Sequence, residues 1–216
     1  MRASSIAVAV APLIVAMTAS AAPMLQLIES TTTAHIYTRV VSGQTTDTID
    51  RSYLHSDAPN MEDSVAGIAA LDGISASVLG TSRTSLTSTE LLADLSTQVY
   101  GRAREKVPNA AIIVETIVEF TGIVTLTEDA TLAVGLTGTS GTDMAGISAG
   151  VGLGFSPVGA EPRGFEPLPY PFVSDYQAGD YEFTIRVFLT GEAPEIFSGG
   201  LFARSDSIAQ MIVRIV

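Results

Sequence analysis

The sequence contains no cysteine and no tryptophan, and it is poor in positive charge and histidine. Without cysteine the chain can form no disulfide, no thiolate metal site and no cysteine nucleophile. Lys106 is its only lysine, and the formal net charge is −12 at pH 7. Because such a chain repels a phosphate backbone, we expect no nucleic-acid partner.

The longest apolar run lies at the N-terminus. The segment "IAVAVAPLIVAM", residues 6–17, follows the positive Arg2 and is too short to span a bilayer. The small-x-small pattern Ala19-Ser20-Ala21 after it is typical of a signal-peptidase site. We therefore expect residues 1–21 to be a cleaved signal peptide, and the mature chain to be exported without a membrane span. A buried strand and an uncleaved anchor are the alternatives.

Alternating apolar and polar residues, separated by turn residues, dominate the rest of the chain. The clearest strands are predicted within residues 34–41, 111–138 and 179–190, and the Ala/Ser/Gly-rich residues 64–80 indicate two strands turning at 71–73. Several short strands and frequent turns predict an all-β fold. We expect an antiparallel, jelly-roll-like β-sandwich that forms a single domain over residues 22–216.

Three segments are less clear. The polar residues 42–63 indicate a short strand inside loops. In residues 87–106, Thr87 and Glu90 have the spacing of a helix capping box, yet the residues that follow also alternate, so helix and strand both stay open, with strand favoured for the second half. Residues 156–175 contain five of the ten prolines, which predicts a Pro-rich surface loop.

The strand "YQAGDYEFTIRVFLTG", residues 176–191, is the best fold marker. Tyr181 and every second residue after it up to Leu189 share one face, and Glu182 and Arg186 are predicted to form a weak surface pair on the other. Phe188 interrupts the polar face, which predicts that a loop or a partner covers it.

The order of these motifs resembles a known group. "VEFTGIVTLTEDATLAVGLTG", then "YQAGDYEFTIRVFL", then "SGG" and a final apolar strand, is similar to exported bacterial β-sandwich proteins of unknown function. Many of that group carry a PEP-CTERM sorting tail, whose Pro-Glu-Pro motif is absent from the sequence here. The resemblance implies an extracellular structural or binding role, and it brings no catalytic residues.

Candidate catalytic motifs lack their context. "GISAG", residues 146–150, matches the G-x-S-x-G nucleophile elbow, but the histidine that should follow Ser148 is missing, because His35 and His55 both precede it. The two histidines also lack metal-ligand spacing. Glu115 and Glu119, four residues apart on one strand, would lie about 13 Å apart, too far for a glycosidase pair.

Two binding hypotheses remain. Tyr170, Phe172 and Tyr176 form the only local aromatic cluster and are candidate ligand-binding residues. The acidic residues of segment 47–63, and Asp175 with Asp180, raise the question of a structural Ca²⁺, although no EF-hand loop is present and we predict no cofactor.

We expect a non-enzymatic structural or adhesive protein of the cell surface or extracellular matrix, with the periplasm as an alternative location. The alternatives are a module that binds carbohydrate or another ligand and, third, a secreted hydrolase with an unrecognised site. Self-association through strand edges and a polysaccharide or surface partner are also open.

Overall fold

The structure is a computed structural model that describes residues 21–58, 60–103, 107, 109–160, 172–193 and 202–216. Residues 1–20 of the predicted signal peptide lie outside this part. The described residues form no helix, and therefore none that could cross a membrane. Their strands are β1 (Leu25–Ser42), β2 (Thr45–Ser56), β3 (Met61–Leu71), β4 (Ile74–Leu86), β5 (Glu90–Ala103), β6 (Ala110–Leu126), β7 (Ala130–Thr142), β8 (Ile147–Pro157), β9 (Phe172–Tyr176), β10 (Gly179–Ala193) and β11 (Phe202–Ile215).

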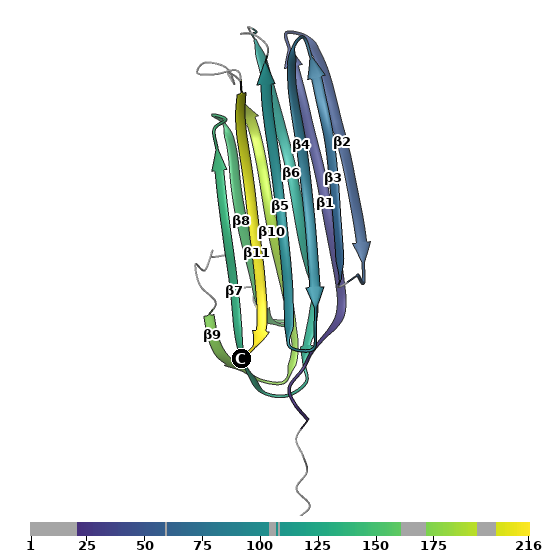
Figure 1. Ribbon diagram of the computed structural model, residues 1–216, viewed down its shortest axis with the longest axis vertical. Helices are drawn as coiled ribbons and strands as arrows, with labels where there is room; N and C mark the ends of the chain where they lie inside the picture. The colour runs from purple at the N-terminus through teal and green to yellow at the C-terminus, as the bar shows by residue number, and fades with distance from the viewer. Residues whose placement is uncertain (1–20, 59, 104–106, 108, 161–171, 194–201) are drawn as a thin grey trace, which may run out of the picture.

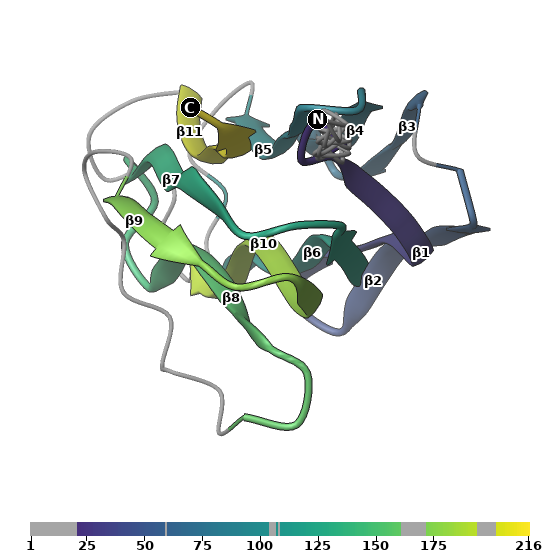
Figure 2. The ribbon, with the colours of Figure 1, turned by 90° about the horizontal axis from the view of Figure 1, so that it is seen from below.

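The strands form two antiparallel sheets that pack face to face, with the strands running along the long axis (Figures 1 and 2). The five-stranded sheet has the order β2-β1-β6-β10-β8, and the six-stranded sheet has the order β3-β4-β5-β11-β7-β9. From β5 onward every connection crosses to the opposite sheet, so the chain winds around one shared core. The all-β antiparallel sandwich predicted from the sequence is confirmed.

Strict alternation builds this core. The even-numbered residues of β6 from Ile112 to Phe120 and the odd-numbered residues of β10 from Tyr181 to Leu189 are all buried, and for β10 this is the face predicted from the sequence. Hydroxyl pairs also join the two sheets. Thr97 in β5 donates to Thr116 in β6 at 2.7 Å, and the Tyr53 and Ser82 hydroxyls lie 2.8 Å apart across the sandwich.

Two local predictions can be compared directly with the backbone. The predicted turn at residues 71–73 is confirmed, because Asp72 and Gly73 have positive φ and join β3 to β4. Residues 90–103 are a strand throughout, and the capping box marks a tight turn instead of a helix. The Thr87 hydroxyl accepts the Glu90 N–H at 3.0 Å, and β5 begins at that residue.

The strand content was underestimated in two places. The polar residues 45–56 form a full edge strand, β2, whose two faces are both largely polar or exposed, and this obscures its alternation. The predicted loop 156–175 has strand at both of its ends, because β8 continues to Pro157 and Phe172 begins β9, while residues 161–171 lie outside the described residues. Pro157 is tolerated there because it ends an edge strand.

The surface pair predicted along β10 is wrong. Arg186 instead pairs with Glu119, its direct neighbour on β6, with a guanidinium nitrogen 2.5 Å from the carboxylate. Residues directly opposite on adjacent strands lie closer than residues four apart on one strand. Phe188 is also explained, since its ring lies across the neighbouring strand and occupies the space where a side chain of Gly150 would be.

Candidate functional site

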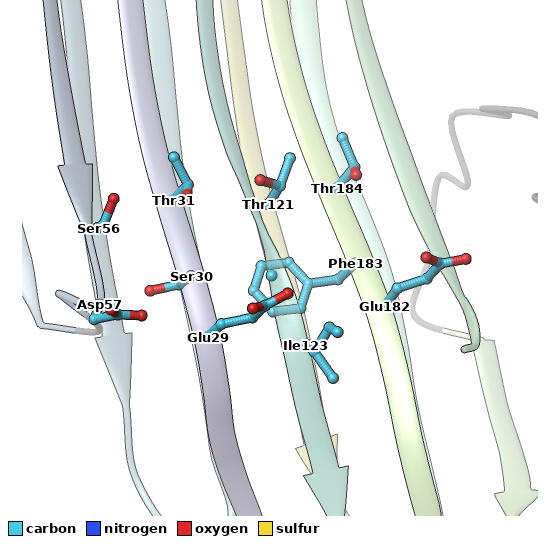
Figure 3. A pocket seen from close by; sticks show the side chains of 11 residues that line it. Glu29, Ser30, Thr31, Ser56, Asp57, Thr121, Ile123, Glu182, Phe183 and Thr184 are labelled. Atoms are coloured by element: carbon cyan, nitrogen blue, oxygen red, sulfur yellow. The ribbon is translucent and has the colours of Figure 1, made fainter. Parts of the chain in front are cut away.

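A shallow depression of about 450 Å³ lies on the outer face of the five-stranded sheet (Figure 3). Thr31, Thr121 and Thr184 form a row across it, one from each of β1, β6 and β10, because the strands pair in register at these positions. In the adjacent row, Ile123 lies between Glu29 and Glu182. The depression therefore offers the threonine row with two further hydroxyls, Ser30 and Ser56, and three carboxylates, those of Glu29, Asp57 and Glu182, around a small apolar centre.

A β-bulge shapes one side of this depression. The register of β1 against β6 shifts between Leu27 and Glu29, which leaves Ile28 as an extra, exposed residue. The shift brings the Glu29 carbonyl against Gly122, where a Cβ would overlap it. Bulges re-aim side chains beside functional surfaces, and here the bulge requires a residue without a side chain on the neighbouring strand.

The Glu29 and Glu182 carboxylates do not face one another. Glu29 extends from β1 toward β6, whereas Glu182 points away, toward β8 (Figure 3). The Ser156 hydroxyl donates to Glu182 at 3.4 Å, which is consistent with that direction. Separated carboxylates and hydroxyls are suited to accepting and donating hydrogen bonds to a polyhydroxylated ligand, but this pair is not arranged for acid–base attack on one bond.

The predicted aromatic cluster is not part of the depression. Tyr170 lies outside the described residues. Phe172 is 58% exposed at the edge strand β9, while Tyr176 packs edge-on against Phe155 and Tyr181. Ligand binding by this cluster remains a prediction, in which Phe172 is the described side chain most accessible to a ligand.

The histidines pair with acidic residues from different elements. His35 lies 3.0 Å from Asp50 on the outer face of the five-stranded sheet. His55 lies 2.5 Å from Asp63, and this pair connects β2 to β3. The hydrogen bond from the Ser64 N–H, and to a smaller extent the one with His55, lowers the pKa of the Asp63 carboxyl.

The G-x-S-x-G match lies within an edge strand. Ser148 is exposed on β8 opposite Thr190, and the residues after it continue the strand instead of turning into a helix. Glu115 is likewise exposed on β6. Neither the backbone context of a nucleophile elbow nor a facing carboxylate pair is therefore present at these positions.

The acidic residues considered for Ca²⁺ have separate partners. Asp175 and Asp180 each accept a threonine hydroxyl, at 2.7 and 2.5 Å. Within the described ranges, no three histidine or acidic side chains gather as metal ligands would.

A second polar cluster, which the sequence did not reveal, closes the sandwich between β2 and β3. Arg51 donates to the Ala66 carbonyl at 2.7 Å, and Asp47 accepts the Ala70 N–H at 2.7 Å. Both bonds use backbone groups of β3, the edge strand of the opposite sheet. Inward-pointing charges are a known protection of sheet edges, so this cluster is structural.

Comparison with known proteins adds no assignment. No family model matches the chain, and no curated protein matches it.

Proposed function

We propose that the protein is a non-enzymatic structural or adhesive protein, exported by its N-terminal signal and acting at the cell surface or in the extracellular matrix. The length of the strands supports this proposal. β1 has 18 residues and β6 has 17, whereas ordinary strands have about 5–6. At about 3.3 Å per residue, β1 spans nearly 60 Å, so the sandwich is a long, stiff body suited to bearing or spacing.

The outer faces support the same role. Some charged side chains on them are paired across neighbouring strands, as in Arg186 with Glu119 and Arg214 with Glu90. Paired charges and hydroxyls keep a large flat surface hydrated, while the remaining negative charge favours solubility. Such a hydrated surface is suited to contacts with a hydrated, hydroxyl-rich polymer.

Deletion of the gene tests this proposal in the producing cells. We expect weaker attachment or cohesion, restored by the wild-type chain and equally by a variant carrying His35→Asn, His55→Asn and Ser148→Ala. The variant removes both histidines and the serine of the hydrolase motif, so a hydrolase that uses them would not restore the phenotype. Unchanged attachment after deletion, or a tagged chain retained in the cytoplasm, would contradict the proposal.

A carbohydrate- or ligand-binding module is the second candidate, and the depression in Figure 3 favours it. A glycan array followed by calorimetry would identify a ligand. Thr121→Val, at the centre of the hydroxyl row, should weaken binding, whereas Thr190→Val, elsewhere on the same face, should not. If Phe172→Ala weakens binding instead, the aromatic cluster at β9 is the site. A folded chain that binds no glycan on the array would count against this candidate.

A further inference from the structure

The edge strands β8 and β3 differ in whether side chains bind their outward backbone groups. β8 is the edge of the five-stranded sheet and, in the part of the chain that the structure describes, pairs only with β10. The Val158 N–H donates to the Asp180 carbonyl at 3.0 Å, which continues the β8–β10 ladder. Because bonded pairs alternate in antiparallel strands, the even-numbered residues of β8 bond β10. Ala149, Val151 and the next two odd-numbered residues therefore direct their N–H and C=O groups outward.

The same alternation shows how the opposite side is protected. The two-residue turn at 72–73 makes Leu71 and Ile74 a bonded pair, so Ala66 and Ala70 direct their backbone groups away from β4. Arg51 and Asp47 bind these outward groups. The sequence of β8 itself, "ISAGVGLGFSP", contains no charge and carries only glycine and serine on its outer face.

We propose that β8 is a docking edge for a second copy of this chain, which pairs with it antiparallel around a two-fold axis at Gly152. This register overlaps the whole strand, because Gly152 is the central residue of 147–157. Every outward residue then meets another outward residue: Val151 faces Leu153 of the second copy, and Ala149 faces Phe155. Each facing pair exchanges two backbone hydrogen bonds.

Side chains at this junction fit a second copy better than an unrelated strand. The large Phe155 lies opposite the small Ala149, and the outer glycines leave no side chain to separate the two sheets. The tip of the Phe188 ring occupies the place that a Gly150 side chain would take. A chain with a net charge of −12 repels its copies over most surfaces, and β8 is a stretch where that repulsion is locally absent.

The symmetry makes this assembly a closed dimer. An isologous contact uses the same edge on both copies and leaves no β8 for a third. On the other side of each sandwich, Arg51 and Asp47 already bind part of the β3 edge. The inference concerns assembly alone and does not depend on an adhesive role.

Single cysteines test the register, because the chain has none of its own. In Gly152→Cys, the two cysteines face each other on the axis as a non-bonded pair with Cα atoms about 4.5 Å apart, within disulfide range. In the matched control Gly154→Cys they lie about 13 Å apart, beyond that range. Mild oxidation should give a covalent dimer in high yield for Gly152→Cys only. Equal cross-linking of both variants, or no cross-linking of Gly152→Cys, would overturn the register.

Sedimentation analysis tests the dimer without cross-links. The wild-type chain should be a dimer, and Ala149→Pro should be a monomer because proline removes an outward N–H without breaking the β10 ladder. Ser52→Pro makes the same change at the outward edge of β2 and should remain a dimer. A monomeric wild type across the accessible concentrations would overturn the proposal, as would a dimer lost only in Ser52→Pro. If a proline variant does not fold by circular dichroism, the cysteine pair decides.

Discussion

Thr38 and Thr97 are both fully buried, yet the same substitution should affect them in opposite directions. The Thr97 hydroxyl donates to Thr116 across the sandwich at 2.7 Å. The Thr38 hydroxyl has no hydrogen-bond partner among the described residues. Thr→Val replaces the hydroxyl by a methyl group of similar size. It therefore removes a hydrogen bond at Thr97 and an unsatisfied polar group at Thr38.

The size of each effect follows from these partners. Thr97→Val loses a net hydrogen bond worth about 0.5–1.5 kcal/mol and leaves Thr116 less well satisfied, so we expect a loss of about 1–2 kcal/mol. Thr116 keeps a weak acceptor, the Leu189 carbonyl at 3.5 Å, which limits the loss. Thr38→Val relieves the desolvation of an unpaired hydroxyl, so we expect a gain of about 1 kcal/mol.

Urea and thermal unfolding followed by far-UV circular dichroism measure both changes, since the chain has no tryptophan to report by fluorescence. For a domain of this size about 1 kcal/mol shifts Tm by about 2–4 °C, so variants that differ by about 2–3 kcal/mol should melt about 4–12 °C apart. The m-values should match the wild type. If Thr38→Val destabilises the protein as much as Thr97→Val, the reasoning from the hydroxyl partners is refuted.

The remaining predictions concern charge, glycine and the strand edge. The lowered pKa of Asp63 means that its carboxylate stabilises the fold above the ordinary value of 3.8, and that this contribution is lost as pH falls through the lower folded value. Asp63→Asn should therefore lose less stability than the wild type when urea midpoints are compared between about pH 5 and about pH 3. Gly150→Ala should destabilise the fold because its Cβ meets the Phe188 ring, and Phe188→Ala should cost less in that background than in the wild type; additive losses would contradict the contact. Arg51→Ala frees a β3 carbonyl and should raise light scattering at high concentration, whereas an unchanged signal would argue against its protective role.

The sequence predicted the elements whose faces differ most. β6 and β10 are central strands with one buried face, so their alternation identifies both the strands and the core residues. The turn at Asp72 and Gly73 was also predictable, because an Asp-Gly pair readily adopts the positive φ values that a two-residue hairpin turn requires. β2 was underestimated because an edge strand with two largely polar faces shows little alternation, although Ile49 and Tyr53 do point inward.

The candidate site depended on strand register, which sequence spacing does not contain. Thr31, Thr121 and Thr184 are far apart in the chain and become a row only through the pairing of β1, β6 and β10. The same limit explains why Arg186 was assigned the wrong partner, since Glu119 is its neighbour across strands.

The position of β11 has a consequence for how the protein is made. This strand, residues 202–215, lies inside the six-stranded sheet between β5 and β7, and the register pairs Glu90 with Arg214. The sheet therefore has a gap at its centre until these residues have left the ribosome. Folding that depends on such distant pairing is slow, so the six-stranded sheet closes only after synthesis of the chain is complete.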